Sequence, residues 1–238
     1  MAARIPKKKA AKKRAAVPSV PDRALRMSPK FEERRAELAD AALVTLADLG
    51  YSRTSLREIA QNTDYSHGVL HYYFADKVEL ITYCVKQYKA ACVRRYDEIV
   101  STARSAHELE RRFGAGMSQT MREDAKLHRL WYDLRSQSLF EPSLREDVEI
   151  IDDTLRRMIW RIVERYAELT GEPPRVGSAL AYAMFDGVFQ HGLNRQLTGD
   201  TKASADLEDQ VVHILRSASA PAIRDVTTVA RPAKRTAR

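Results

Sequence analysis

The sequence predicts an all-α fold, and three observations carry that prediction. Apolar residues recur every three or four positions along most of the chain. No segment shows sustained alternation of apolar and polar residues with β-branched side chains, which a sheet would require. The interruptions fall at residues typical of turns, such as Gly171-Glu-Pro-Pro174. With 238 residues, 44% of them hydrophobic, the chain can bury one sizeable core or two small ones.

The first predicted helix begins at Ser28-Pro29 and ends before Gly50. Serine is a favourable N-cap, and proline fits the first turn because its missing N–H has no partner there. Glycine is the usual C-terminal cap. The helix places its apolar side chains on one face, formed by Leu38, Ala42, Leu46 and Leu49.

Two short helices are predicted between Ser55 and Phe74. Ser55 caps the first, and Ser66 caps the second after a turn at Asn62-Thr63-Asp64. The spacing of Leu70, Tyr73 and Phe74 turns them toward the core, which leaves an outward face of His67, Gly68, His71 and Tyr72. Two capped helices joined by a compact turn are typical of a helix-turn-helix.

A long helix from Lys77 to about Arg104 follows, and five further helices are predicted near 106–122, 125–138, 142–170, 174–197 and 204–219. The last two resemble an association surface, because Ala179, Ala183 and Gly187 are small enough for another helix to approach closely. The alternative is that they only close the core of the protomer.

The net charge of +8 is concentrated at the two ends. Residues 1–30 carry ten lysines and arginines against Asp22, and residues 220–238 carry five against Asp225. Both segments lack apolar periodicity and are predicted to be disordered basic tails. The N-terminal arm either contacts DNA phosphates or serves only solubility.

Several classes of protein are disfavoured. No apolar run is long enough to span a bilayer and no signal peptide is recognisable, so we expect a cytoplasmic protein. Cys84 and Cys92 on one helix would be about 12 Å apart, too far for a disulfide, and are expected to be buried thiols. Motifs of hydrolases, phosphate loops and zinc proteases are missing, and histidines do not pair with cysteines at metal-ligand spacing. We therefore expect no enzyme activity, no cofactor and no metal.

The segment from Gly50 to Leu80 carries a family resemblance. It contains the run G-Y-S-R-T-S-L-R-E-I-A, then S-H-G-V-L-H-Y-Y-F, then K-x-x-L. Together with residues 31–49, this segment resembles the TetR family of bacterial transcription regulators. Two positions depart from the usual pattern, Asp64 in the turn and His71 in the recognition helix. Shorter runs at 130–131, 141–145 and 185–187 resemble the BetI-like subset.

The resemblance implies a three-helix DNA-binding domain over 31–77, with its helix-turn-helix at 55–74, and a helical effector-binding and dimerisation domain over 78–219. Residues that it places at DNA are Thr54, Ser55, Arg57, Ser66, His67, Gly68, Val69, His71, Tyr72, Tyr73 and Lys77. Residues that it places around a small-molecule effector are Phe113, Met117, Met121, His128, Trp131, Tyr132, Arg135, Met158, Tyr182, Phe185 and Phe189. A homodimer is expected through 174–219.

The resulting hypothesis is a repressor that leaves a palindromic double-stranded operator when an effector binds. An architectural DNA-coating protein, which binds mainly through its basic tails, is the first alternative. The second is a helical ligand-binding or scaffold protein whose helix-turn-helix no longer reads DNA.

Overall fold

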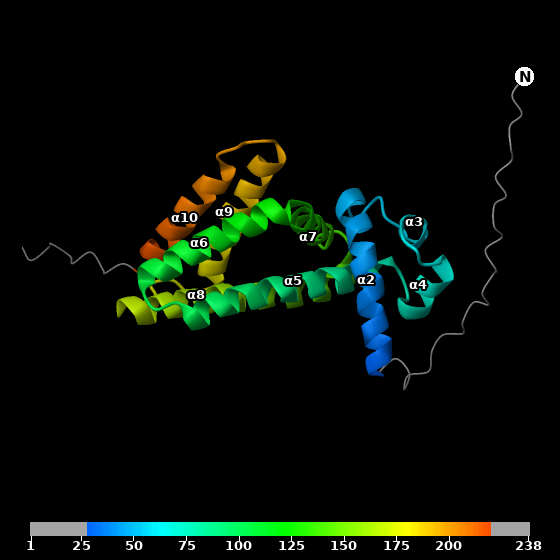
Figure 1. Cartoon of the computed structure of the whole chain (residues 1–238), viewed down its shortest axis with the longest axis horizontal. Helices are drawn as coiled ribbons and strands as arrows, with labels where there is room; N and C mark the ends of the chain where they lie inside the picture. Colours follow the sequence, from blue (N-terminus) through cyan, green and yellow to red (C-terminus); the bar gives the residue numbers. More distant parts are fainter. Residues whose placement is uncertain (1–27, 220–238) are drawn as a thin grey trace, which may run out of the picture. The chain divides into compact units, whose positions relative to one another are not determined.

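The computed structural model describes residues 28–219, and within them the chain is helical and contains no strand (Figure 1). The all-α prediction is confirmed for this part of the chain. The elements are α2 (Pro29–Leu49), α3 (Leu56–Asn62), α4 (His67–Tyr73), α5 (Lys77–Thr102), α6 (Ala106–Glu123), α7 (Ala125–Gln137), the short 3-10 helix η1 (Pro142–Leu144), α8 (Arg145–Thr170), α9 (Ser178–Leu197) and α10 (Ala203–Ser219). The predicted basic arm and tail lie outside the described residues, except that Ser28 caps α2 and residues 29–30 begin it.

The described chain forms two compact units that are interleaved in sequence. The first holds residues 28–88 together with Arg129–Val148, and the second holds Lys89–His128 together with residues 149–219. Helices α5, α7 and α8 each contribute residues to both units. The expected functional boundary after residue 77 stays a prediction, because compactness alone does not separate DNA binding from effector binding.

Helices α2, α3 and α4 form the start of the first unit, and each begins at a serine. The side chains of Ser28, Ser55 and Ser66 accept hydrogen bonds from backbone N–H groups three residues later, at 3.3, 3.2 and 3.3 Å. These bonds satisfy N–H groups that lack a partner within the helix. The caps therefore fix locally where each helix starts.

The turn between α3 and α4 is made without backbone strain. Among the described residues, positive φ angles occur only at glycines, so Asp64 has an ordinary conformation. The side chain of Thr63 stabilises the turn. Its hydroxyl donates to the carbonyl of Ile59 at 2.9 Å and accepts from the N–H of Tyr65 at 3.4 Å.

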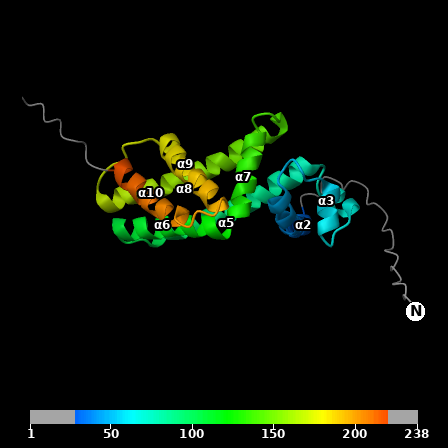
Figure 2. The same ribbon diagram turned by 90° about the horizontal axis from the view of Figure 1, so that it is seen from above.

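In the second unit, α10 packs against both α6 and α9 (Figure 2). The packing is close at two glycines. A Cβ on Gly114 would lie 3.3 Å from the carbonyl oxygen of Glu208, and one on Gly192 would lie 3.1 Å from the sulfur of Met121. A larger residue at either position would require these neighbouring atoms to shift.

Helix α9 begins at Ser178 and not at residue 174 as the sequence predicted. Pro173 and Pro174 disfavour helical continuation, and Gly177 is extended at φ −78° and ψ 165°. The N–H of Arg175 donates to the carbonyl of Ala218 at 2.8 Å, so this segment pairs with the end of α10. The later start of α9 therefore depends in part on a residue 43 positions away in the chain.

Two other expectations concern the cysteines and the membrane. Cys84 and Cys92 are both buried free thiols, which confirms the prediction, and burial raises the pKa of Cys84. Of the helices within 28–219, none combines the length and apolar character needed to cross a bilayer.

Candidate nucleic-acid interface

Helix α4 presents a small polar surface that we call the reading face: Ser66, His67, Gly68, Val69 and His71. The two histidines and Ser66 are exposed, and Gly68 and Val69 are partly exposed. On the opposite side Leu70 is fully buried, and it anchors α4 to the core. Helix α4 therefore has an apolar inner face and an outer face of short or polar residues, as a helix that reads a DNA groove requires.

The two histidines of the reading face contact each other. Their rings are one helical turn apart and meet edge-to-face, with 4.4 Å between the ring centroids. The pKa of His67 is lowered by partial desolvation and by the charges of His71 and Arg57. A neutral imidazole offers both a donor and an acceptor nitrogen, which suits hydrogen bonding to a base edge.

The expected phosphate contacts at α3 divide into one exposed residue and two that are engaged within the protein. Arg57 is exposed. Thr54 is only 3% exposed, and its hydroxyl donates to the carbonyl of Gly50 at 2.7 Å. The hydroxyl of Ser55 caps α3. Arg53, which the sequence reasoning did not single out, is also exposed in the loop before α3, and its Nε donates to the carbonyl of Leu49 at 3.1 Å.

The expected tyrosines at the end of α4 pack against the start of α2. The Tyr73 ring lies 4.7 Å from the Phe31 ring and 5.0 Å from the Tyr72 ring, measured between centroids. Both tyrosines are only partly exposed. Their ring contacts hold α4 against α2.

Lys77, also expected at DNA, is engaged with Tyr51. Its ammonium donates to the Tyr51 carbonyl at 3.2 Å and lies 4.1 Å from the centroid of the Tyr51 ring. This combines a charge-assisted hydrogen bond with a cation–π contact. Within the described structure Lys77 therefore fixes the segment that leads into α3.

Tyr51 is also held by two carboxylates from outside the helix-turn-helix. Its N–H donates to Asp133 at 2.7 Å, and its hydroxyl hydrogen-bonds to Glu141. One turn before Asp133 on α7, the guanidinium of Arg129 donates to the carbonyl of Ala47 in the last turn of α2, at 2.7 Å. We call Tyr51, Lys77, Arg129, Asp133 and Glu141 the junction. Sequence reasoning missed four of these residues, because their partners lie far away in the chain.

The expected effector residues of the second unit are mostly buried. Phe113 and Phe185 meet edge-to-face with centroids 5.5 Å apart, and the Phe189 ring lies 4.6 Å from the His128 ring. Tyr182 is partly exposed and hydrogen-bonds through its hydroxyl to Asp152. Met117, Met121 and Met158 are also buried.

The remaining expected effector residues, Trp131, Tyr132 and Arg135, belong to the first unit. Trp131 is buried, and the other two are partly exposed. Helix α7 thus carries expected effector residues on both sides of the division between the units. The assignment of an effector to any of these side chains stays a prediction.

Lys89 is a buried charged residue that the sequence reasoning missed. It is 4% exposed, and its ammonium lies 3.0 Å from Nδ1 of His128. Burial lowers the pKa of Lys89 to about 8, and burial together with the charges of Lys89 and Arg95 lowers the pKa of His128 well below its usual value. Lys89 lies one turn from Val85 and from Cys92 in the apolar stripe of α5. This position in the sequence could have indicated that Lys89 is buried.

Comparison with known proteins agrees with this architecture. Residues 38–84 match the family described as bacterial regulatory proteins, tetR family. The HTH-type transcriptional regulator BetI of Paraburkholderia phymatum is 29% identical over 194 residues, which cover 79% of this chain and 96% of that protein. BetI of Burkholderia thailandensis is 29% identical over 191 residues, covering 77% and 94%.

Solved structures share the fold at lower identity. A TetR transcription regulator from Haloarcula marismortui aligns with a TM-score of 0.66 at 14% identity, covering 79% of this chain and all of that chain. The transcriptional regulator FadR of Bacillus subtilis, in complex with stearoyl-CoA, aligns with a TM-score of 0.64 at 19% identity, covering 77% and 98%. Residues 38–84 carry the DNA-binding segment of the tetR family, and together with the all-helical remainder and the BetI relatives they support a TetR family transcription regulator.

Proposed function

We propose that this regulator is a homodimeric repressor that binds a palindromic operator and is released from it by a small-molecule effector. The observation that carries the proposal is the reading face, which α4 holds outward between a serine cap and the buried Leu70. Regulators of this family bind DNA and small-molecule effectors and are dimeric. Direct base contacts are assigned to His67, Val69 and His71, and phosphate contacts to Arg57, Ser66 and the Tyr72 hydroxyl.

Dimerisation is assigned to residues 174–219, as the sequence suggested. Leu180 on α9 is 54% exposed, and Ala183 and Gly187 are exposed on the same helix. An exposed leucine beside small residues suits close approach of a second helix. Two-fold symmetry of such a dimer would place two reading helices on the two halves of a palindrome.

The effector is assigned to the second unit, around the aromatic and methionine side chains near Phe113 and Phe189. Apolar and aromatic linings favour ligands with a large apolar part. FadR, a protein of the same fold, was solved with stearoyl-CoA bound, which supports an apolar effector here without identifying it.

Helix α7 is the proposed route from effector to DNA. His128 and Asp133 lie five residues apart on this helix, which corresponds to about 7.5 Å along its axis. An effector that favours a shifted α7 would change the hydrogen bonds of Arg129 with Ala47 and of Asp133 with Tyr51, and so reposition α3 and α4. Couplings of this kind are typically worth about 1–3 kcal/mol.

Selection of bound DNA from a random duplex pool at about 150 mM salt tests the proposal, because non-specific phosphate binding is suppressed there. The full chain and a variant that lacks residues 1–27 should enrich the same palindrome, the variant with lower affinity. Binding without any enriched sequence would contradict the repressor. Loss of nearly all binding on deletion would favour the architectural alternative.

A further inference from the structure

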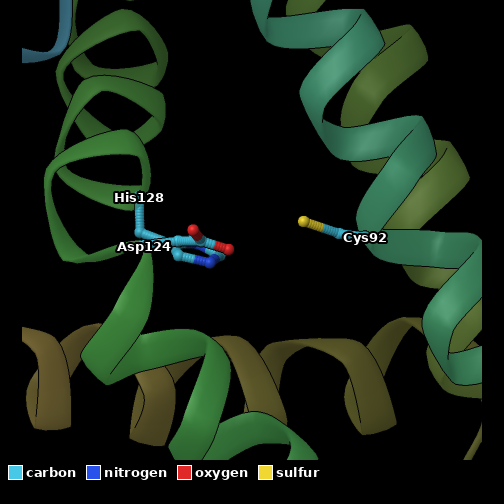
Figure 3. Close-up of side chains that lie close together, drawn as sticks. All are labelled: Cys92, Asp124 and His128. Atoms are coloured by element: carbon cyan, nitrogen blue, oxygen red, sulfur yellow. The ribbon is translucent and has the colours of Figure 1, made fainter. Parts of the chain in front are cut away.

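Three side chains with metal-ligand atoms converge in the second unit, although the sequence contains no recognisable metal motif. In the part of the chain that the structure describes, the Cys92 sulfur, a carboxylate oxygen of Asp124 and a ring nitrogen of His128 all lie within 4.8 Å of one another. Figure 3 shows Cys92 on α5 pointing across to Asp124 and His128, whose side chains lie close together. We propose that Cys92, Asp124 and His128 form a site for a divalent transition metal of borderline softness, such as Zn²⁺.

The backbone fixes two of these ligands relative to each other. Asp124 caps the end of α6, and its carbonyl accepts a hydrogen bond from the N–H of His128 at 3.0 Å. Residues four apart in helical geometry place their side chains on one face. This i, i+4 relation was present in the sequence, but Cys92 comes from another helix and no spacing along the chain could reveal it.

The donor set determines the class of metal. Sulfur, imidazole nitrogen and carboxylate oxygen together are typical ligands of Zn²⁺ and of Co²⁺, whereas Mg²⁺ and Ca²⁺ prefer oxygen alone. Ligand atoms of a tetrahedral zinc site are roughly 3.3–3.8 Å apart, given bond lengths of about 2.0–2.3 Å. The separations of up to 4.8 Å would contract modestly by rotation of the three side chains.

The protein encloses most of the site. Cys92 and His128 are 4% and 6% exposed, and Asp124 is partly exposed, which leaves one side for a water ligand. On binding, the Cys92 thiol loses its proton to solvent and its sulfur forms the bond to the metal.

Two cations near the site oppose metal binding. The proposal therefore predicts that removing one of these charges strengthens metal binding. The Lys89 ammonium lies 3.0 Å from Nδ1 of His128, and the Arg95 guanidinium lies 3.8 Å from the Asp124 carboxylate. Both would repel a divalent cation. Replacing Lys89 by methionine keeps the apolar stem and removes the charge, so Lys89→Met should bind the metal at least about tenfold more tightly.

The experiment is a titration of the full chain, without DNA, with Co²⁺ as the spectroscopic probe. We expect one cobalt per chain and a thiolate-to-cobalt charge-transfer absorption in the near ultraviolet. Cys92→Ala should abolish the absorption and Asp124→Asn should weaken binding at least tenfold. Cys84→Ala is the matched control, because Cys84 is also a buried thiol on α5 but lies in the first unit. Circular dichroism checks that each variant is folded.

The proposal would be overturned by no cobalt absorption in the wild-type chain, by an absorption that survives in Cys92→Ala or is lost in Cys84→Ala, or by unchanged affinity in Lys89→Met. Because the titration contains no operator, its failure would leave the proposed DNA-binding function untouched. The proposal does reassign His128 from effector contact to metal ligand.

Discussion

The carboxylate of Asp133 accepts a hydrogen bond from the backbone N–H of Tyr51 at 2.7 Å. These residues are 82 positions apart, and the bond joins α7 to the segment that leads into the helix-turn-helix. A carboxylate with a backbone N–H forms a charge-assisted hydrogen bond, which is stronger than one between neutral groups. The contact therefore makes α7 part of the support of the reading face.

Asp133→Ala should destabilise the protein and weaken operator binding. Loss of the acceptor leaves the Tyr51 N–H without its partner, at a cost of about 1–3 kcal/mol in the free energy of unfolding. Urea unfolding measures the loss, and fluorescence anisotropy measures operator affinity. Ser136→Ala, at an exposed position of the same helix, is the control and should match the wild type in both. Equal effects of the two substitutions would contradict the proposed role of Asp133 in supporting the reading face.

Lys77→Met distinguishes a junction residue from a phosphate contact. If Lys77 holds Tyr51, the variant loses about 1 kcal/mol of stability, while the dependence of operator affinity on salt keeps its slope. A lysine at a phosphate would instead reduce that slope by about one. We expect the first result, from urea unfolding and from binding at several salt concentrations.

His71→Ala and Arg57→Ala should have different effects on DNA binding. Loss of a base contact should reduce discrimination at one operator position by about tenfold, whereas loss of a phosphate contact should weaken all sequences similarly. Binding to a set of single-base operator variants measures both effects. Gln61→Ala, exposed on α3, is the control. Uniform loss in His71→Ala would contradict its role as a base-reading residue.

Gly187→Arg should dissociate the dimer without unfolding the protomer. Outside its own helix backbone, no described atom lies within 4 Å of where a Cβ on Gly187 would be placed, so the larger side chain fits. Arginine also favours a helix over glycine by up to about 1 kcal/mol. Analytical ultracentrifugation should show a monomer for Gly187→Arg and a dimer for Ala115→Arg, a control on the exposed side of α6. If Gly187→Arg stays dimeric with an unchanged dimerisation affinity, the dimer interface does not include this face of α9.

Acidification should destabilise the second unit through Glu110. This buried carboxylate accepts two hydrogen bonds from Arg216, at 2.9 and 2.8 Å, and one from the Tyr166 hydroxyl at 2.7 Å. The hydrogen bonds with Arg216 lower the pKa of Glu110 below its usual 4.5, although burial opposes this. The unfolded chain therefore takes up the proton first, and the stabilisation present above pH 4.5 is lost as pH falls through the folded value.

Glu110→Gln provides the test of that pH dependence. Near neutral pH the variant should be less stable than the wild type, and the difference should narrow below pH 4.5. Urea unfolding over a pH series gives the free energies. A constant difference between the two chains at every pH would show that Glu110 keeps its ordinary pKa.

The features that the sequence predicted correctly are those that depend on neighbouring residues. The caps of α3 and α4 at Ser55 and Ser66 follow from bonds to residues three positions later. The end of α2 at Gly50 follows from a backbone with φ of 77°, which glycine adopts without strain. Local chemistry of this kind is legible in a single sequence.

The features that were missed depend on residues far apart in the chain. Helix α9 begins four residues later than the sequence predicts, because Arg175 pairs with Ala218 at the end of another helix. The junction was missed because Asp133 and Glu141 are 82 and 90 positions from Tyr51. Helical periodicity indicates which side of a helix is inward but does not identify the partner it meets there.

The unstrained backbone at Asp64 allows a label to be introduced that reports motion of the helix-turn-helix. The residue is exposed and its φ is not positive, so other side chains can occupy the turn without strain. The two native thiols, Cys84 and Cys92, are both buried. A cysteine introduced at position 64 would therefore be the readily labelled thiol, and a fluorophore attached there would report directly when the DNA-reading helices move.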